Sequence, residues 1–230
     1  MAMIRQCVRP AHVIVLYGSK ARGDYDNASD HDILIVEDSP GSSTVDTMTN
    51  ETSLVRYDWS EFSEMSTYGS LFLRHLRKEG KFLSGNREGR ERYLGILASL
   101  PAYSRVDRDI QSFEMAIDDC MDALESGDSS IEFELSSIAT VVRHASILGC
   151  YLVGTLEFSR YESVRCFCLA TQLRFEIAME FPELYNYRIA VMRNKKLPRR
   201  PEISYAYEWV TRSRAVLREV TRLATYAAMC

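Results

Sequence analysis

The residues best suited to chemistry lie between positions 16 and 36. A short apolar run ends in Gly18-Ser19, a Gly, Asp and Asn-rich stretch follows, and the next apolar run opens with Asp30 and Asp32. In a strand, residues i and i+2 point to the same face about 7 Å apart, so both carboxylates can hold shared divalent cations. Backbone N–H groups and a hydroxyl at the Gly18-Ser19 turn, at the mouth of a helix, favour phosphate oxygens. Together these features indicate a nucleoside triphosphate with Mg²⁺.

The segments around these residues predict a small mixed sheet. β-Branched and aromatic runs predict strands over 13–17, 30–36 and 53–59, and turn-forming residues predict loops over 23–29 and 37–44. From Ser70 the apolar period changes from two to three or four, which predicts a helix that Gly85 ends.

After about residue 86 the patterns predict helices alone. The candidates are 90–100, 105–125, 135–152, 164–181 (ended before Pro182) and 203–229. We therefore expect an α+β protein with a small mixed β-sheet domain over residues 1–85 and an all-α helical bundle over residues 86–230.

The whole motif resembles a known superfamily. Tyr17-Gly18-Ser19, ten residues, then Asp30-His31-Asp32 is similar to the pattern of nucleotidyltransferases of the DNA polymerase β type. The longer strings GSKARG and SDHDILIV resemble the bacterial minimal nucleotidyltransferases and the antibiotic-modifying members. The segment 69–83 resembles the helix after the catalytic sheet in defence-associated members. The resemblance implies a catalytic nucleotidyltransferase domain at 1–85 and a helical acceptor-binding domain at 86–230.

The resemblance also implies how nucleotide is bound. Gly18 and Ser19 would bind the β and γ phosphates. Lys20 and Arg22 follow this turn directly. Either side chain could reach the triphosphate, and either could instead be solvated.

By the same resemblance, Asp30 and Asp32 would hold two Mg²⁺ ions, and a third carboxylate would come from a later strand. Asp58 fits best because it ends the third expected strand, and Glu61 is the alternative. Asp58 would ligate metal and could take the acceptor proton. His31 points to the opposite face of the strand, so we expect a packed or partly exposed side chain rather than a ligand.

The charge is unevenly distributed. The formal net charge of −4 excludes a uniformly basic nucleic-acid-binding protein. Residues 86–187 carry nine cations and seventeen acids, whereas residues 188–230 carry ten cations and three acids. The basic cluster at 188–200 holds six cations and no acid, which indicates either a solvated face or a track for the phosphates of an oligonucleotide or nucleic acid.

The resemblance implies transfer of a nucleoside monophosphate from an NTP or dNTP to an acceptor hydroxyl, with release of pyrophosphate. The basic cluster and the defence-like helix favour a nucleotide or nucleic-acid acceptor, as in oligonucleotide synthesis for antiviral defence. The acidic middle segment favours an alternative, an adenylyltransferase of the aminoglycoside type. A third possibility is a toxin or antitoxin enzyme that modifies a protein or tRNA.

The compartment is indicated by the cysteines and by the apolar runs. The six cysteines are scattered in a chain too large to need disulfides, which indicates reduced thiols. The N-terminal stretch does not resemble a signal peptide, and we expect no membrane span. We therefore expect a cytoplasmic enzyme, in which a partner protein encoded nearby could regulate activity.

Overall fold

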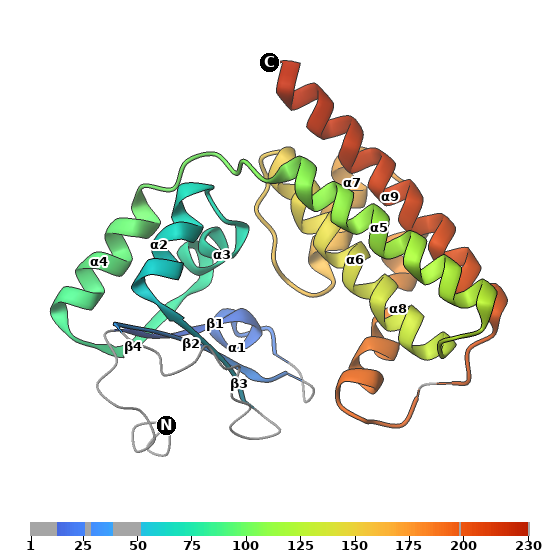
Figure 1. Cartoon of the computed structure of the whole chain (residues 1–230), viewed down its shortest axis with the longest axis horizontal. Coiled ribbons are helices and arrows are strands. Elements are labelled where there is room, and N and C mark those ends of the chain that lie inside the picture. Colours follow the sequence, from blue (N-terminus) through green and yellow to red (C-terminus); the bar gives the residue numbers. More distant parts are fainter. Residues whose placement is uncertain (1–12, 26–28, 39–51, 198, 230) are drawn as a thin grey trace. The chain divides into compact units, whose positions relative to one another are not determined.

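The chain folds into two compact units, Met1–Ser104 and Arg105–Cys230 (Figure 1). The computed structural model describes residues 13–25, 29–38, 52–197 and 199–229. The first unit contains a sheet with helices, and the described part of the second is helical. This arrangement confirms the expected α+β fold class.

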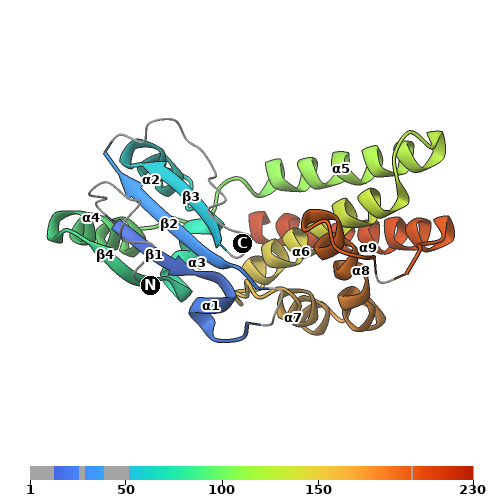
Figure 2. The same cartoon turned by 90° about the horizontal axis from the view of Figure 1, so that it is seen from below.

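The sheet of the first unit is mixed. Its strands are β1 (Val13–Tyr17), β2 (His31–Glu37), β3 (Thr52–Asp58) and β4 (Lys81–Gly85), in the order β3-β2-β1-β4. The central strand β1 is antiparallel to both β2 and β4, whereas β2 and β3 are parallel. Figure 2 shows the strands side by side, with the short helix α1 (Gly18–Arg22) following β1.

Three helices cover one face of this sheet (Figure 1): α2 (Trp59–Thr67), α3 (Leu71–Glu79) and α4 (Arg87–Ala98). The core between the layers is built from every second strand residue and from the apolar sides of the helices: Val13, Val15, Tyr17, Leu34, Val36, Trp59, Phe62, Leu73, Leu76, Tyr93 and Leu97. Strand side chains alternate between the two faces of a sheet, so Asp32 lies on the same face as Leu34 and Val36. This face lies toward the helices.

The second unit is built around α6 (Ile131–Leu152), which α5 (Val106–Ser126), α7 (Glu162–Thr171), α8 (Glu176–Met192) and α9 (Ile203–Met229) all contact. The residues that predict this helix by their spacing are buried: Leu135, Ile138, Val142, Ala145 and Leu148. Among the described residues, α6 is also the one helix long and apolar enough to cross a membrane. Because 67% of its apolar window is buried inside the unit, it is typical of the core helix of a bundle.

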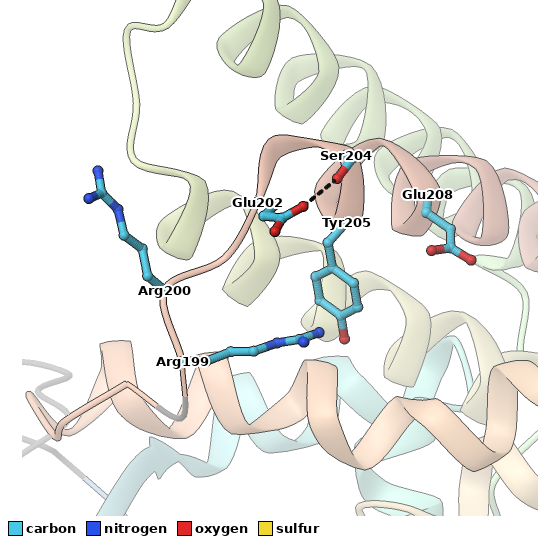
Figure 3. Close-up of a pocket in the computed structure, with 6 residues that line it drawn as sticks. All are labelled: Arg199, Arg200, Glu202, Ser204, Tyr205 and Glu208. Carbon is cyan, nitrogen blue, oxygen red and sulfur yellow. Dashed lines mark hydrogen bonds between the residues drawn. The ribbon is translucent and has the colours of Figure 1, made fainter.

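A polar pocket of about 290 Å³ lies where α9 begins (Figure 3). It is lined by Arg199, Arg200, Glu202, Ser204, Tyr205 and Glu208. The Arg199 guanidinium lies 5.2 Å from the centre of the Tyr205 ring, and the Ser204 hydroxyl donates to Glu202 at 3.4 Å. The pocket is thus mixed in charge, with one aromatic wall.

The predicted helix from Ser70 to Gly85 is wrong in its second half. Helix α3 ends at Glu79, Gly80 has extended backbone, and residues 81–85 form β4. A Cβ at Gly80 would lie 2.5 Å from Leu76 O and 3.1 Å from Val15 Cγ1, both closer than van der Waals contact, so the tight crossing from helix to strand needs glycine. The short alternating run after it completes the sheet.

Two other expectations also changed. Helix α2 was not expected, although Asp58 and Glu61 form a capping box at its start. The single helix expected at 164–181 is two, α7 and α8, separated near Gln172, which has a positive φ of 56°. Helix α8 continues past Pro182. The expected loops at 23–29 and 37–44 lie partly outside the described residues.

Candidate active site

The antiparallel pairing of β1 and β2 brings the two halves of the motif together. Asp32, near the start of β2, is the register partner of Tyr17 at the end of β1. Gly18, the next residue along the chain, therefore lies beside the Asp32 side chain. Asp30 directly precedes β2 and, like Asp32, is partly buried, whereas His31 between them is exposed.

Gly18 and Asp32 lie so close that residue 18 must be glycine. Gly18 has a φ of +70°, in the left-handed region that other residues rarely adopt. A Cβ at this position would also overlap Asp32 Oδ2. The Asp32 carboxylate thus occupies the space that a side chain would fill, directly over the backbone of the turn.

Helix α1 carries the turn and is closed by Gly23. The Gly23 N–H donates to the Ser19 carbonyl at 2.8 Å, and Gly23 has a φ of +93°. The N-cap residue of α1, Tyr17, makes no side-chain hydrogen bond to the start of the helix. The Lys20 ammonium lies 3.9 Å from the centre of the exposed Tyr25 ring, a cation–π contact that holds it beside the turn.

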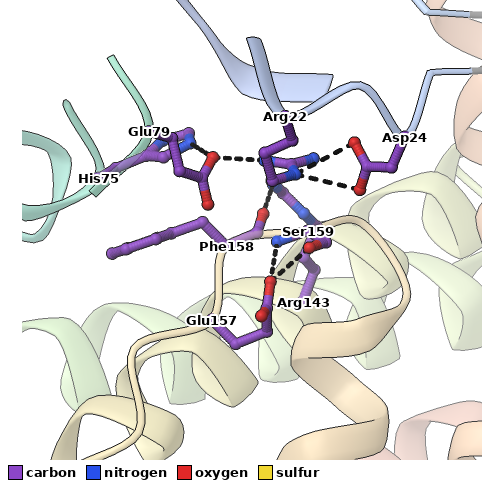
Figure 4. Close-up of polar contacts among 8 residues, drawn as sticks. All are labelled: Arg22, Asp24, His75, Glu79, Arg143, Glu157, Phe158 and Ser159. Carbon is purple, nitrogen blue, oxygen red and sulfur yellow. Dashed lines mark hydrogen bonds and ion pairs between the residues drawn. The ribbon is translucent and has the colours of Figure 1, made fainter. Parts of the chain in front are cut away.

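Arg22, a candidate phosphate ligand, is held by two carboxylates (Figure 4). Its Nε donates to Asp24 Oδ2 at 3.0 Å, and its Nη1 donates to Glu79 Oε2 at 2.5 Å. Glu79 also pairs with His75 at 2.8 Å. Neither His75 nor Glu79 is predicted from the sequence to belong to the site, although their i, i+4 spacing on one helix face is a usable signal.

Tyr17 remains neutral beside Asp32. Burial raises the pKa of the Tyr17 hydroxyl far above its ordinary value, and the negative charge of Asp32 raises it further. The ring lies edge-on to both His75 and Phe72, at centroid distances of 5.6 and 5.5 Å. The end of β1 is therefore fixed against α3 by packing rather than by charge.

The structure does not bring Asp58 to the other carboxylates. Because β3 runs parallel to β2, Asp58 is the register partner of Glu37, five residues beyond Asp32. At the strand rise of about 3.3 Å per residue, this places Asp58 about 17 Å along the sheet from Asp32. The β3 residue opposite Asp32 is Ser53.

Asp58 and its alternative, Glu61, serve the start of α2 instead. Asp58 Oδ1 accepts the Glu61 N–H at 2.7 Å, and Glu61 Oε2 accepts the Asp58 N–H at 2.9 Å. This reciprocal capping box satisfies two N–H groups that a helix start leaves without partners. Both carboxylates proposed as a third metal ligand are thus held at the far end of β2.

Asp30 and Asp32 are a fitting donor set for Mg²⁺. In the part of the chain that the structure describes, no three His, Cys, Asp or Glu side chains form a group that could hold a metal ion. Mg²⁺, however, is usually bound by one or two carboxylates together with substrate phosphates and water. The Asp32 carboxylate on the Gly18 backbone provides such an arrangement, since metal and phosphate sites would adjoin.

Part of the basic cluster at 188–200 is already bonded within the second unit. Arg188 donates to the Thr140 hydroxyl at 2.5 Å, and Arg199 pairs with Glu183 at 2.7 Å. Lys195, Lys196 and Arg200 are exposed. Arg199 is exposed as well, but Glu183 offsets its charge, so the net surface charge of the cluster is smaller than its composition indicates.

A family model matches most of the first unit. Residues 4–84 match the family model of the nucleotidyltransferase domain. Residues 4–84 form a nucleotidyltransferase domain. Such a domain supports transfer of nucleoside monophosphates and generally uses a divalent metal, usually Mg²⁺. The matched range contains the Gly18-Ser19 turn and both Asp30 and Asp32.

Among solved structures, the chain is similar to a nucleotidyltransferase-like protein from Exiguobacterium sibiricum 255-15. The two are 13% identical with a TM-score of 0.42, over 99% of this chain and 75% of that one. No curated protein matches the chain.

Two glycine substitutions test the contact between Gly18 and Asp32. Gly18→Ala and Gly23→Ala both place a side chain on left-handed backbone, at a cost of about 1–2 kcal/mol. No described residue lies within 4 Å of a Cβ at Gly23, so only Gly18→Ala displaces Asp32. We expect similar losses of thermal stability, but a loss of nucleotidyl transfer of about a hundredfold for Gly18→Ala alone. Equal transfer rates in the two variants would contradict the contact.

Asp58→Ala tests the placement of the third carboxylate. Removal of this helix cap should lower the free energy of unfolding by about 1 kcal/mol. Because Asp58 lies at the far end of β2, we expect transfer at the wild-type rate, measured in parallel with Asp32→Ala, which should lose it. A loss with Asp58→Ala as deep as that with Asp32→Ala would show that Asp58 serves the reaction.

Proposed function

We propose that this protein transfers a nucleoside monophosphate from an NTP or dNTP to a hydroxyl of a nucleotide or nucleic-acid acceptor. In this reaction a bond forms between the acceptor oxygen and the α-phosphorus, the bond from the α-phosphorus to the bridging oxygen breaks, pyrophosphate leaves, and the acceptor hydroxyl releases its proton to water. The observation that carries the proposal is the Asp32 carboxylate packed on Gly18 within the nucleotidyltransferase domain. This contact places a metal ligand, Asp32, beside the turn that would bind the phosphates.

The proposed roles follow the described geometry. The N–H groups and hydroxyl of Gly18 and Ser19 bind the β and γ phosphates, and Lys20 adds positive charge beside them. Asp30 and Asp32 hold Mg²⁺, with two ions as the predicted number. When bound, Mg²⁺ would lower the pKa of the acceptor hydroxyl and neutralise charge on the triphosphate.

The partly buried position of Asp32 serves this role. A carboxylate with reduced access to water interacts more strongly with nearby charges than a fully solvated one. The Asp32 carboxylate also lies against the Gly18 backbone, where the phosphates would bind.

We further propose that residues 1–85 carry out catalysis and that helices within 86–230 bind the acceptor. The exposed Lys195, Lys196 and Arg200, with the pocket at the start of α9, support an acceptor with phosphates and bases, since bases stack on aromatic rings such as Tyr205. The remaining expectations are proposals of the same kind: a cytoplasmic enzyme, a role in bacterial antiphage defence and a partner protein encoded nearby.

A cationic small-molecule acceptor is the second candidate. Helix α5 supports it, because Asp107, Asp118, Asp119 and Asp122 on that helix are exposed. The protein incubated with each labelled NTP and dNTP alone distinguishes the candidates. An oligomer ladder supports a nucleotide acceptor, whereas product that forms only on addition of an aminoglycoside, tRNA or protein supports the corresponding alternative.

The catalytic assignment is tested by Asp30→Ala combined with Asp32→Ala. Removal of both carboxylates should abolish pyrophosphate release from every NTP and dNTP, because no metal would be held beside the phosphate turn. Glu37→Gln, a carboxylate at the other end of β2, is the matched control and should release pyrophosphate at the wild-type rate. Release that persists in the double variant would exclude the proposed mechanism.

The acceptor site is tested by charge reversal at Lys195, Lys196 and Arg200. If these side chains contact phosphates, the plot of log affinity against log salt should become shallower by about one unit for each lost contact. Reversal of Arg165, Arg174 and Arg222, exposed elsewhere in the second unit, changes the net charge equally and should leave the slope unchanged. Equal slopes for both triple variants would make the cluster a solvated surface.

A further inference from the structure

Three side chains join the phosphate turn to helix α3, and we call them the Arg22–Glu79–His75 brace (Figure 4). Glu79 Oε2 is its centre, because it accepts from Arg22 Nη1 at 2.5 Å and lies 2.8 Å from His75 Nε2. The His75 ring in turn contacts the edge of Tyr17 at a centroid distance of 5.6 Å and an interplanar angle of 89°. The brace is thus attached to the chain on both sides of Gly18, at Tyr17 before it and at Arg22 after it.

The brace is withdrawn from solvent. The side chain of Glu79 is 4% exposed, and those of His75 and Arg22 are 13% and 18% exposed. A carboxylate so placed remains charged only if it is paired and hydrogen-bonded. Burial alone would raise the pKa of Glu79, but the hydrogen bond and charge of His75, together with those of Arg22, lower it below its ordinary value. An ion pair of this kind is sensitive to the loss of one partner.

Helix α1 depends on such external support. It has five residues, and isolated helices shorter than about 12 residues are marginal in water. Its N-cap residue, Tyr17, makes no side-chain hydrogen bond to the first turn. Its buried side chain is Ala21, and its two ends are held by the packing of Tyr17 before Gly18 and by the ion pair of Arg22 after Ser19. Both end attachments lead to His75 and Glu79 on α3.

We propose that the brace positions the Gly18–Ser19 backbone to receive the β and γ phosphates of the nucleotide. The proposal rests on the proposed function, and deepens it by assigning three positioning residues to the same site. Arg22 then acts through Glu79 and not on the triphosphate. Its Nε and Nη1 are already engaged by Asp24 and Glu79.

Glu79→Gln tests the brace because it keeps the shape of the side chain and removes its charge. The matched control is Glu37→Gln, which breaks the Arg56–Glu37 pair of 3.2 Å in the same unit, where Glu37 is 13% exposed. The readouts are thermal unfolding, steady-state kinetics, and calorimetric affinity with Mg²⁺ for a non-hydrolysable triphosphate analogue and for the corresponding monophosphate. The monophosphate lacks the β and γ groups.

We expect the two variants to lose comparable stability. Only Glu79→Gln should weaken triphosphate binding, by about tenfold, which corresponds to about 1.4 kcal/mol. Its monophosphate affinity should be unchanged, and KM should rise more than kcat falls. The proposal would be overturned if Glu79→Gln weakened the binding of triphosphate and monophosphate equally, or if both variants weakened triphosphate binding equally. Either result would show that Glu79 gives general structural support only.

A double-mutant cycle tests whether Arg22 acts through Glu79. If it does, Arg22→Gln combined with Glu79→Gln should bind triphosphate no more weakly than the worse single variant. Additive losses would show that Arg22 contacts the triphosphate itself, and would overturn this part of the proposal. Should Glu79→Gln not fold, Arg22→Lys gives the same test, because lysine keeps the charge but cannot bridge Glu79 and Asp24 as the guanidinium fork does.

Ser19→Ala and Asp32→Ala separate failure of the brace from failure of the proposed function. If neither weakens triphosphate binding, the nucleotide does not bind at this turn and the proposed function fails. If both weaken it and Glu79→Gln does not, the nucleotide site stands and the brace alone is excluded.

Discussion

The close approach of the Asp32 carboxylate to the Gly18 backbone is the constraint on which the site depends. It requires glycine at residue 18 both for the left-handed φ of +70° and for the space that the carboxylate occupies. It also requires β1 and β2 to pair in one register, with Tyr17 opposite Asp32. A shift of one residue would turn Asp32 to the other face of the sheet and separate the metal ligand from the phosphate turn.

The rest of the first unit maintains this register. Val13, Val15 and Tyr17 of β1 pack with Leu34 and Val36 of β2 beneath the helices, so the same alternation that buries the core directs Asp32. Helix α3 contributes apolar residues to this core and, through Glu79, the carboxylate that holds Arg22. Helix α3 therefore contributes both to the stability of the unit and to the position of the five-residue helix α1.

The net charge of −4 is the sum of acidic and basic segments. Side-chain pairing further reduces the positive charge that the basic segment can offer to a ligand. In the basic cluster at 188–200, Arg188 bonds to Thr140 and Arg199 pairs with Glu183. Neither partner is adjacent in sequence, so composition overstates the charge available to a ligand. The exposed cations Lys195, Lys196 and Arg200 define a smaller surface at one end of the helical unit.

Local spacing was sufficient to predict the parts of the fold that rest on short-range order. Strand β1 and helix α9 have the predicted bounds, and the α+β class is confirmed. The boundary between α3 and β4 was not predictable from spacing, because five alternating residues after a helix become a strand only when β1 offers a free edge. Pro182 likewise does not end α8, since burial of that helix outweighs the loss of one backbone hydrogen bond.

The sequence by itself determined the Gly18-Ser19 turn and the Asp30, Asp32 pair, because their geometry follows from the two-residue repeat of a strand. Only the tertiary structure decided where Asp58 lies. The direction of β3 is a long-range property, and in parallel pairing with β2 it carries Asp58 to the opposite end of the sheet. The contact between Arg22 and Glu79 joins residues 57 positions apart and likewise exists only in the folded unit, where packing of α3 on β1 brings them together.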